Sequence, residues 1–79
     1  MATPSELDLR TLPPEQRHGL VFQTFDALAV GEALVLVNDH DPAPLLQQFR
    51  FVRPGQAVSE YLERGPVDWR VRIARKAAP

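Results

Sequence analysis

The chain has 79 residues, no cysteine and nearly balanced charge, with nine basic against ten acidic side chains. This length fits one domain with a modest core, and the lack of cysteine excludes disulfides, thiolate metal ligands and thiol nucleophiles. Balanced charge gives no overall field for nucleic acid, and no apolar run reaches the ~20 residues of a membrane span. We therefore expect a soluble cytoplasmic protein that binds neither nucleic acid nor membrane.

The first half of the chain predicts two strands separated by a helix. Residues 6–10 alternate between apolar and charged side chains, which is typical of a short half-buried strand. The next apolar residues recur at helical spacing, so a helix should begin at Pro14 and end at Gly31. Its inward positions would be His18, Val21, Phe22, Phe25, Leu28 and Ala29. Residues 32–37 are apolar on both faces and predict a central strand.

The second half predicts a helix and two further strands. Asp39 or Asp41 should cap a helix that begins at Pro42 and turns Leu45, Leu46 and Phe49 inward. Residues 57–63 and 68–74 then read as strands, and the last one places Trp69, Val71 and Ile73 on one face. The order βαβαββ predicts an α+β two-layer sandwich with two helices on one face of a four-stranded sheet. We delimit one domain at residues 6–75, with flexible tails at 1–5 and 76–79.

The opposite face of this sheet poses a problem, because Val35 and Val37 lie across the central strand from Leu34 and Leu36. One of these pairs must face away from the helices. Shielding by long neighbouring side chains is the favoured explanation, and the residues expected to provide it are Arg10, Arg70, Arg72 and Tyr61. The alternative is that a partner protein or a second copy of the chain covers this face.

Polar side chains follow the buried strand at residues 38–41, the stretch Asn38-Asp39-His40-Asp41. The carboxyl ends of parallel strands meet at one edge, where both helices also begin, so His18 should converge there with Asp39, His40 and Asp41. Arg17 and Gln48 are expected at the rim. Two histidines with Asp39 or Asp41 supply the ligand types of zinc, iron or copper, although the Asp-His-Asp triplet is not a diagnostic spacing.

Other roles for these residues remain open. Asp39 and Asp41 can cap the second helix while Asn38 forms a turn and His40 hydrogen-bonds locally. His18 can be a partly buried core residue. The two helix N-termini would instead favour an anion. Catalysis is disfavoured, because no Gly-x-Ser-x-Gly elbow or phosphate loop accompanies an imidazole beside a carboxylate.

Several motifs resemble an uncharacterised domain family (domain of unknown function 2249) that is similar to the TusA/SirA sulfur carriers. They are Leu-Asp-Leu-Arg at 7–10, Leu-Pro-Pro at 12–14, Arg17-His18, Phe25-Asp26, Gly31-Glu32, Leu36-Val37-Asn38-Asp39-His40-Asp41-Pro42 and Trp69-Arg70-Val71. The resemblance implies a βαβαββ sandwich with sheet order 1-2-4-3 and an antiparallel last strand. It also implies association with hemerythrin-like, redox or nitrogen-oxide proteins. The carriers use a Cys-Pro-x-Pro motif where this chain has Leu12-Pro13, so sulfur-carrier activity is not expected.

Two principal functions are therefore predicted. The first is a small non-catalytic module that binds a ligand through Arg17, His18, Asn38, Asp39, His40 and Asp41, or a metal through His18, His40 and Asp39, and works with a redox or hemerythrin-like partner. The alternative is an interaction domain, monomeric or weakly dimeric, that docks through the open sheet face. A weaker third possibility is an enzyme or carrier that uses a bound cofactor.

Overall fold

The computed structural model describes residues 5–77, and its elements follow the predicted order. The strands are β1 (Ser5–Asp8), β2 (Ala33–Asn38), β3 (Ala57–Arg64) and β4 (Trp69–Arg75), and the helices are α1 (Pro14–Asp26) and α2 (Ala43–Val52). Among the described residues, no helix is long and apolar enough to cross a bilayer.

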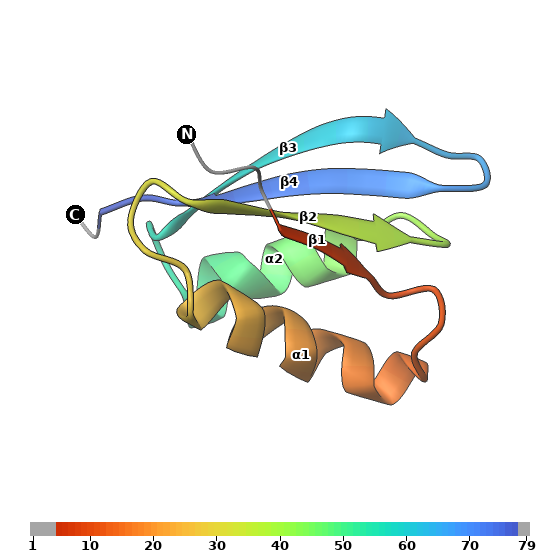
Figure 1. Cartoon of the computed structure of the whole chain (residues 1–79), viewed down its shortest axis with the longest axis horizontal. Helices are drawn as coiled ribbons and strands as arrows, with labels where there is room; N and C mark the ends of the chain where they lie inside the picture. The colour runs from red at the N-terminus through yellow and green to blue at the C-terminus, as the bar shows by residue number, and fades with distance from the viewer. Residues whose placement is uncertain (1–4, 78–79) are drawn as a thin grey trace.

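The strands form one mixed sheet in the order β1-β2-β4-β3. β1 is parallel to β2, whereas β4 runs antiparallel to both of its neighbours. Both helices lie on the same face of this sheet (Figure 1). The predicted α+β class, the strand order and the antiparallel last strand are thus confirmed.

The core lies between the sheet and the helices. Leu34 pairs with Ile73 and Leu36 with Val71, and all four side chains are fully buried. From the helices, Phe49 packs edge-on against Phe25, with 5.0 Å between the ring centroids. The apolar spacing of the sequence therefore identified the inward face of α2 correctly.

Two predicted boundaries are wrong because local hydrogen bonds turn the chain early. α1 ends at Asp26 rather than at Gly31, since the amide of Ala27 donates to the carbonyl of Thr24 and tightens the last turn. Ala29, expected to face inward, is exposed in the following turn. β1 ends at Asp8 rather than at residue 10, because the Asp8 carboxylate accepts the amide of Arg10 at 3.0 Å.

Over the central strand β2, the open face of the sheet is covered by side chains of the neighbouring strands. Val37 is 0% exposed although it points away from the helices, beside Arg70 in the antiparallel register. Arg70 bonds to Glu6 on β1 and to Glu63 on β3, so its side chain extends across β2. The expected shielding by arginine is confirmed for Arg70.

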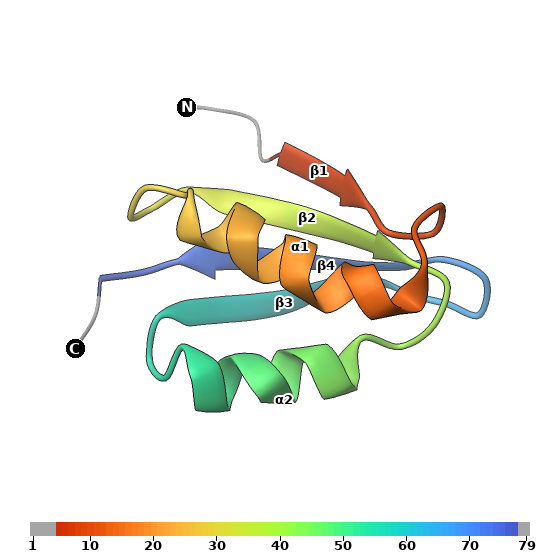
Figure 2. The same cartoon turned by 90° about the horizontal axis from the view of Figure 1, so that it is seen from below.

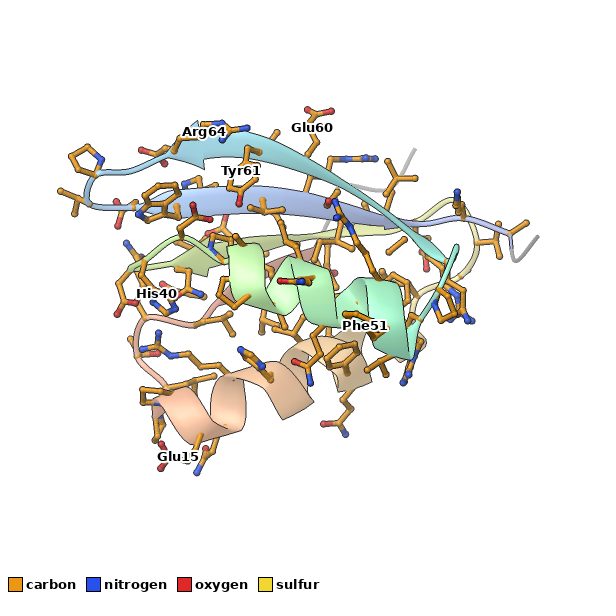
Figure 3. The ribbon with its side chains drawn as sticks, turned by 180° about the vertical axis from the view of Figure 1, so that it is seen from behind. Glu15, His40, Phe51, Glu60, Tyr61 and Arg64 are labelled. Carbon is orange, nitrogen blue, oxygen red and sulfur yellow. The ribbon has the colours of Figure 1, made fainter. Side chains whose placement is uncertain are left out.

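Tyr61 does not take part in this cover, contrary to the prediction. It pairs with Val71, a core residue, and its ring points from β3 toward α2 (Figure 3). The pairing with Val71 fixes this direction, because residues directly opposite one another on neighbouring strands point to the same face of the sheet. The size and chemistry of Tyr61 suggested a shielding role, but its register opposite Val71 decides which face it occupies.

The predicted tails fall mostly outside the described residues. Residues 1–4 and 78–79 lie there entirely. Ser5 belongs to β1, where it pairs with Leu34. The amide of Lys76 donates to the carbonyl of Gln56 at 3.0 Å. Backbone pairing therefore reaches one residue beyond the predicted domain limits at each end.

Candidate functional site

The loops that follow β1 and β2 meet at the edge of the sheet where α1 and α2 begin (Figures 1 and 2). The main-chain bond from Leu9 to Val37, 2.8 Å long, continues the pairing of the two strands up to this edge. His40 lies at the edge, beside the start of α2 (Figure 3). The prediction that the polar stretch would lie at the helix starts is thus confirmed for His40.

A buried arginine holds the two loops together. Arg17, in the first turns of α1, is only 7% exposed. Its Nε donates to the carbonyl of Leu12 at 3.0 Å, and its Nη1 donates to Asn38 Oδ1 and to Asp39 Oδ1, each at 3.0 Å. These acceptors compensate the loss of water around the guanidinium, which makes its burial tolerable. Arg17 therefore fixes the end of β2 against the start of α1.

Asn38 completes this connection from the strand. It is buried, and its Oδ1 also accepts the amide of Asp39 at 2.9 Å. The side chain thus takes up a backbone donor at the point where the sheet ladder ends. The sequence had indicated a turn role for Asn38, and the structure adds its bond to Arg17.

Asp39 links the buried arginine to the exposed imidazole of His40. The hydrogen bond from Arg17 is the main reason that the pKa of Asp39 falls to about 2, and the bond from His40 adds to it. Nδ1 of His40 lies 2.8 Å from Asp39 Oδ1. Because the carboxylate is ionised at neutral pH and has no proton to give, Nδ1 carries the proton in this bond.

His40 consequently presents its other nitrogen to solvent. The side chain is 61% exposed. A neutral imidazole that is protonated at Nδ1 has its lone pair on Nε2, which is the atom that can ligate a metal or accept a hydrogen bond. Arg17, Asp39 and His40 therefore form a relay that orients one exposed imidazole at the edge.

Asp41 turns away from this relay toward α2 and β3. Its Oδ1 accepts the amide of Ala43 at 3.0 Å and the hydroxyl of Tyr61 at 2.6 Å. The bond to Asp41 is the main cause of a raised pKa at Tyr61, so the phenol remains a donor at neutral pH. Asp41 thus supports the start of α2 as predicted, whereas Asp39, the other candidate cap, bonds to Arg17 instead.

His18 is placed differently from the prediction. Its ring is on the exposed surface of α1, and its Nδ1 lies 2.8 Å from Oε1 of Gln48 on α2. The stripe of α1 that faces the core is Arg17, Val21 and Phe25. Counting the helix in steps of four from Arg17 would have found this stripe, because all three residues lie on one row. The charge of Arg17 led the prediction to place it at the rim.

The structure assembles four of the six predicted ligand residues and places the other two elsewhere. The structure brings together Arg17, Asn38, Asp39 and His40, while His18 bonds to Gln48 and Asp41 bonds to Tyr61. Within residues 5–77, no three histidine, aspartate or glutamate side chains form a group able to hold a metal ion. The predicted set of His18, His40 and Asp39 is thus not assembled here, and His40 is the member best oriented to bind.

Comparison with known proteins identifies a family but no characterised relative. A family model described as "Uncharacterized conserved protein (DUF2249)" matches residues 6–75. No curated protein and no solved structure gives a significant match. The description of the family names no activity, so function must be argued from the geometry.

Proposed function

The chain belongs to the DUF2249 family, and we propose that it is a small non-catalytic accessory module that presents the imidazole of His40 to a metal centre or hydrogen-bond donor of a partner protein. The observation that carries this proposal is the relay from the buried Arg17 through Asp39 to His40, with contacts of 3.0 and 2.8 Å. The partner that the family resemblance implies is a redox or hemerythrin-like protein.

The relay has the organisation that metal-binding histidines commonly show. A ligating imidazole usually donates its second N–H to a carboxylate, which fixes the orientation of the ring and raises its basicity. Asp39 supplies that carboxylate, and Arg17 keeps it ionised and in place. One oriented imidazole is too little for a tight site in this chain alone, since structural zinc sites need about four ligands. The remaining ligands would therefore come from the partner.

The absence of catalysis in this proposal also has a physical basis. Asp39 Oδ1 is bonded to both Arg17 and His40, Asp39 Oδ2 accepts from Arg17, and Asn38 is bonded to Arg17. Position 12, where the sulfur carriers would have their cysteine, holds a leucine whose carbonyl is bonded to Arg17. The polar groups of the edge thus position one another, and His40 is the group left to act on a ligand.

Titration with zinc, copper or iron, followed by NMR of the two imidazoles, tests this proposal. We expect His40 to show the Nδ1–H tautomer and to respond to metal before His18, with weak affinity in the isolated chain. The variant Asp39→Asn should shift His40 toward the other tautomer, because an amide does not fix the proton on Nδ1. His18→Ala is the matched control, and it should leave the response of His40 unchanged. Equal and simultaneous shifts of both rings would contradict the proposal.

The alternative function, docking through the open sheet face, has less support from the geometry. Val37, the apolar residue that would make the contact, is completely covered, and Arg70 is held over it by two ion pairs. A partner would have to displace both pairs to reach Val37. A docking role is better supported at the edge strand β3.

A further inference from the structure

The two edges of the sheet differ in length and in cover. β1, at one edge, has four residues, whereas β3, at the other, has eight. Within residues 5–77, β3 pairs only with β4, so its outer amides and carbonyls have no strand beside them. A bulge between Tyr61 and Glu63 leaves residues 57–61 as the regular part of this edge. Long regular edges are sites at which another strand can add.

α2 is offset from the sheet on the side of this edge. Viewed from the helix side, α1 lies under the middle of the sheet, while α2 lies beyond β3 (Figure 2). Between α2 and β3 runs a groove of about 450 Å³ that is lined by Ala43, Leu46, Gln47, Arg50, Ser59 and Tyr61. A strand added beside β3 would lie above α2, and α2 would then be its floor.

The charged residue among those that line the groove is Arg50, and Arg64 lies beside the lining residue Tyr61. Among the described residues, Arg50 of α2 and Arg64 of β3 form no ion pair. The guanidinium of Arg64 lies 4.0 Å from the centroid of the Tyr61 ring. The carboxylate of Asp41 accepts hydrogen bonds from the Tyr61 hydroxyl and the amide of Ala43, at the opposite end of α2 from Arg50. Acidic side chains that point toward α2 would therefore find two available cations.

On the other face, the regular part of this edge carries Val58 and the charged Glu60, which pairs with Arg72. Val58 is 50% exposed and pairs with Ala74 on the open side of the sheet. Successive side chains of an added strand point alternately to the two faces. A segment that alternates acidic and apolar residues would thus place its acids over α2 and its apolar side chains beside Val58. Pairing of β3 with β3 of a second copy is less suitable, because it would set the two Arg50 side chains toward each other.

We propose that the β3 edge and α2 form a docking groove for an extended partner segment with alternating acidic and apolar side chains, which joins the sheet as a fifth strand. This surface is separate from His40. The link between them is Tyr61, which lines the groove and bonds to Asp41 at the edge.

The test uses fluorescently labelled eight-residue peptides that alternate valine with glutamate or valine with lysine. We expect the glutamate peptide to bind and to shift the NMR signals of residues 57–61 and of α2, while the lysine peptide binds at least tenfold more weakly. Arg50→Gln should weaken binding about fivefold, the value of one exposed ion pair. Gln23→Glu, on the exposed surface of α1, lowers the net charge by the same amount as Arg50→Gln. It should change the binding affinity by no more than about twofold.

Peptides methylated at alternate backbone nitrogens distinguish strand addition from attraction of charges alone. An added strand uses one of its two edges, so methylation in one phase should abolish binding, whereas methylation in the other phase should preserve it. Equal binding by both methylated peptides would overturn the proposal. So would a concentration-dependent dimer that protects the β3 amides and binds no peptide, because the edge would then belong to a second copy.

Discussion

Both faces of the sheet bury apolar residues of the central strand β2, but by different means. On one face, Leu34 and Leu36 pack against two helices and their aromatic rings. On the other, Val37 is equally buried, and arginine side chains held by carboxylates extend over the sheet. A small domain with only two helices can thus cover a second apolar surface without a third layer.

This difference should matter energetically. The helix face is an interlocked core, in which a removed group leaves a cavity that its neighbours fill only in part. The cover of the open face consists of long flexible chains, whose ion pairs are exposed and contribute little each. The open face should therefore tolerate substitution better, although burial alone does not distinguish the two.

Neighbouring residues of β2 provide the most sensitive test. Leu36 and Val37 are adjacent and are both 0% exposed, one on each face. Leu36→Ala should lower the free energy of unfolding by about 2–5 kcal/mol, because it leaves a cavity. Val37→Ala should lower it by about 1–2 kcal/mol, close to the transfer value of the lost groups, because the arginine stems can settle into the space. Urea unfolding followed by Trp69 fluorescence measures both, and similar losses per methylene would remove the distinction between the faces.

Two substitutions of Arg70 separate its stem from its charge. Arg70→Met keeps a long apolar stem but loses the ion pairs to Glu6 and Glu63, so the free energy of unfolding should change by less than about 1 kcal/mol. Arg70→Ala also exposes Val37 and should cost about 1 kcal/mol more. Hydrogen exchange at the amide of Val37 should speed up only in the alanine variant. Equal effects would show that the charges, rather than the stem, close this face.

Much of the fold was predictable because it depends on short-range patterns. Apolar alternation marked the strands, helical spacing marked α2, and the family motifs supplied the strand order. The boundaries at Asp8 and Asp26 were missed, because single side-chain and backbone bonds decide where the chain turns. At such an end, the chain either makes the next regular hydrogen bond of the strand or helix or enters a turn, and the hydrophobic pattern of the sequence does not distinguish the two.

The site was predictable in position but only partly in composition. Topology placed residues 38–41 at the helix starts, and His40 does lie there. The grouping of side chains depended instead on one turn of α1, where Arg17 faces inward and His18 outward. A difference of one residue rotates a side chain by about 100° around the helix, which decides whether it meets Asp39 or Gln48. Charge favoured the wrong choice, because buried arginines are uncommon unless several acceptors surround them.

The smallest expected difference between the faces lies in their response to acid. Bonds from Arg10 are the main reason that the pKa of Asp8 falls from 3.8 to about 2, and Asp39 falls to a similar value through Arg17. A carboxyl whose pKa is lower in the folded state stabilises the fold above its unfolded pKa, and this contribution is lost as pH falls from about 4 through 2. Urea midpoints measured between pH 5 and 2 should therefore fall, and the fall should be smaller in Asp8→Asn. Leu36→Ala should have a lower urea midpoint at every pH. The dependence of its midpoint on pH should equal that of the parent protein, because no titrating group depends on the packing of Leu36. If Asp8→Asn shows the same pH dependence of the urea midpoint as the parent protein, the Asp8 carboxylate does not help to close the open face.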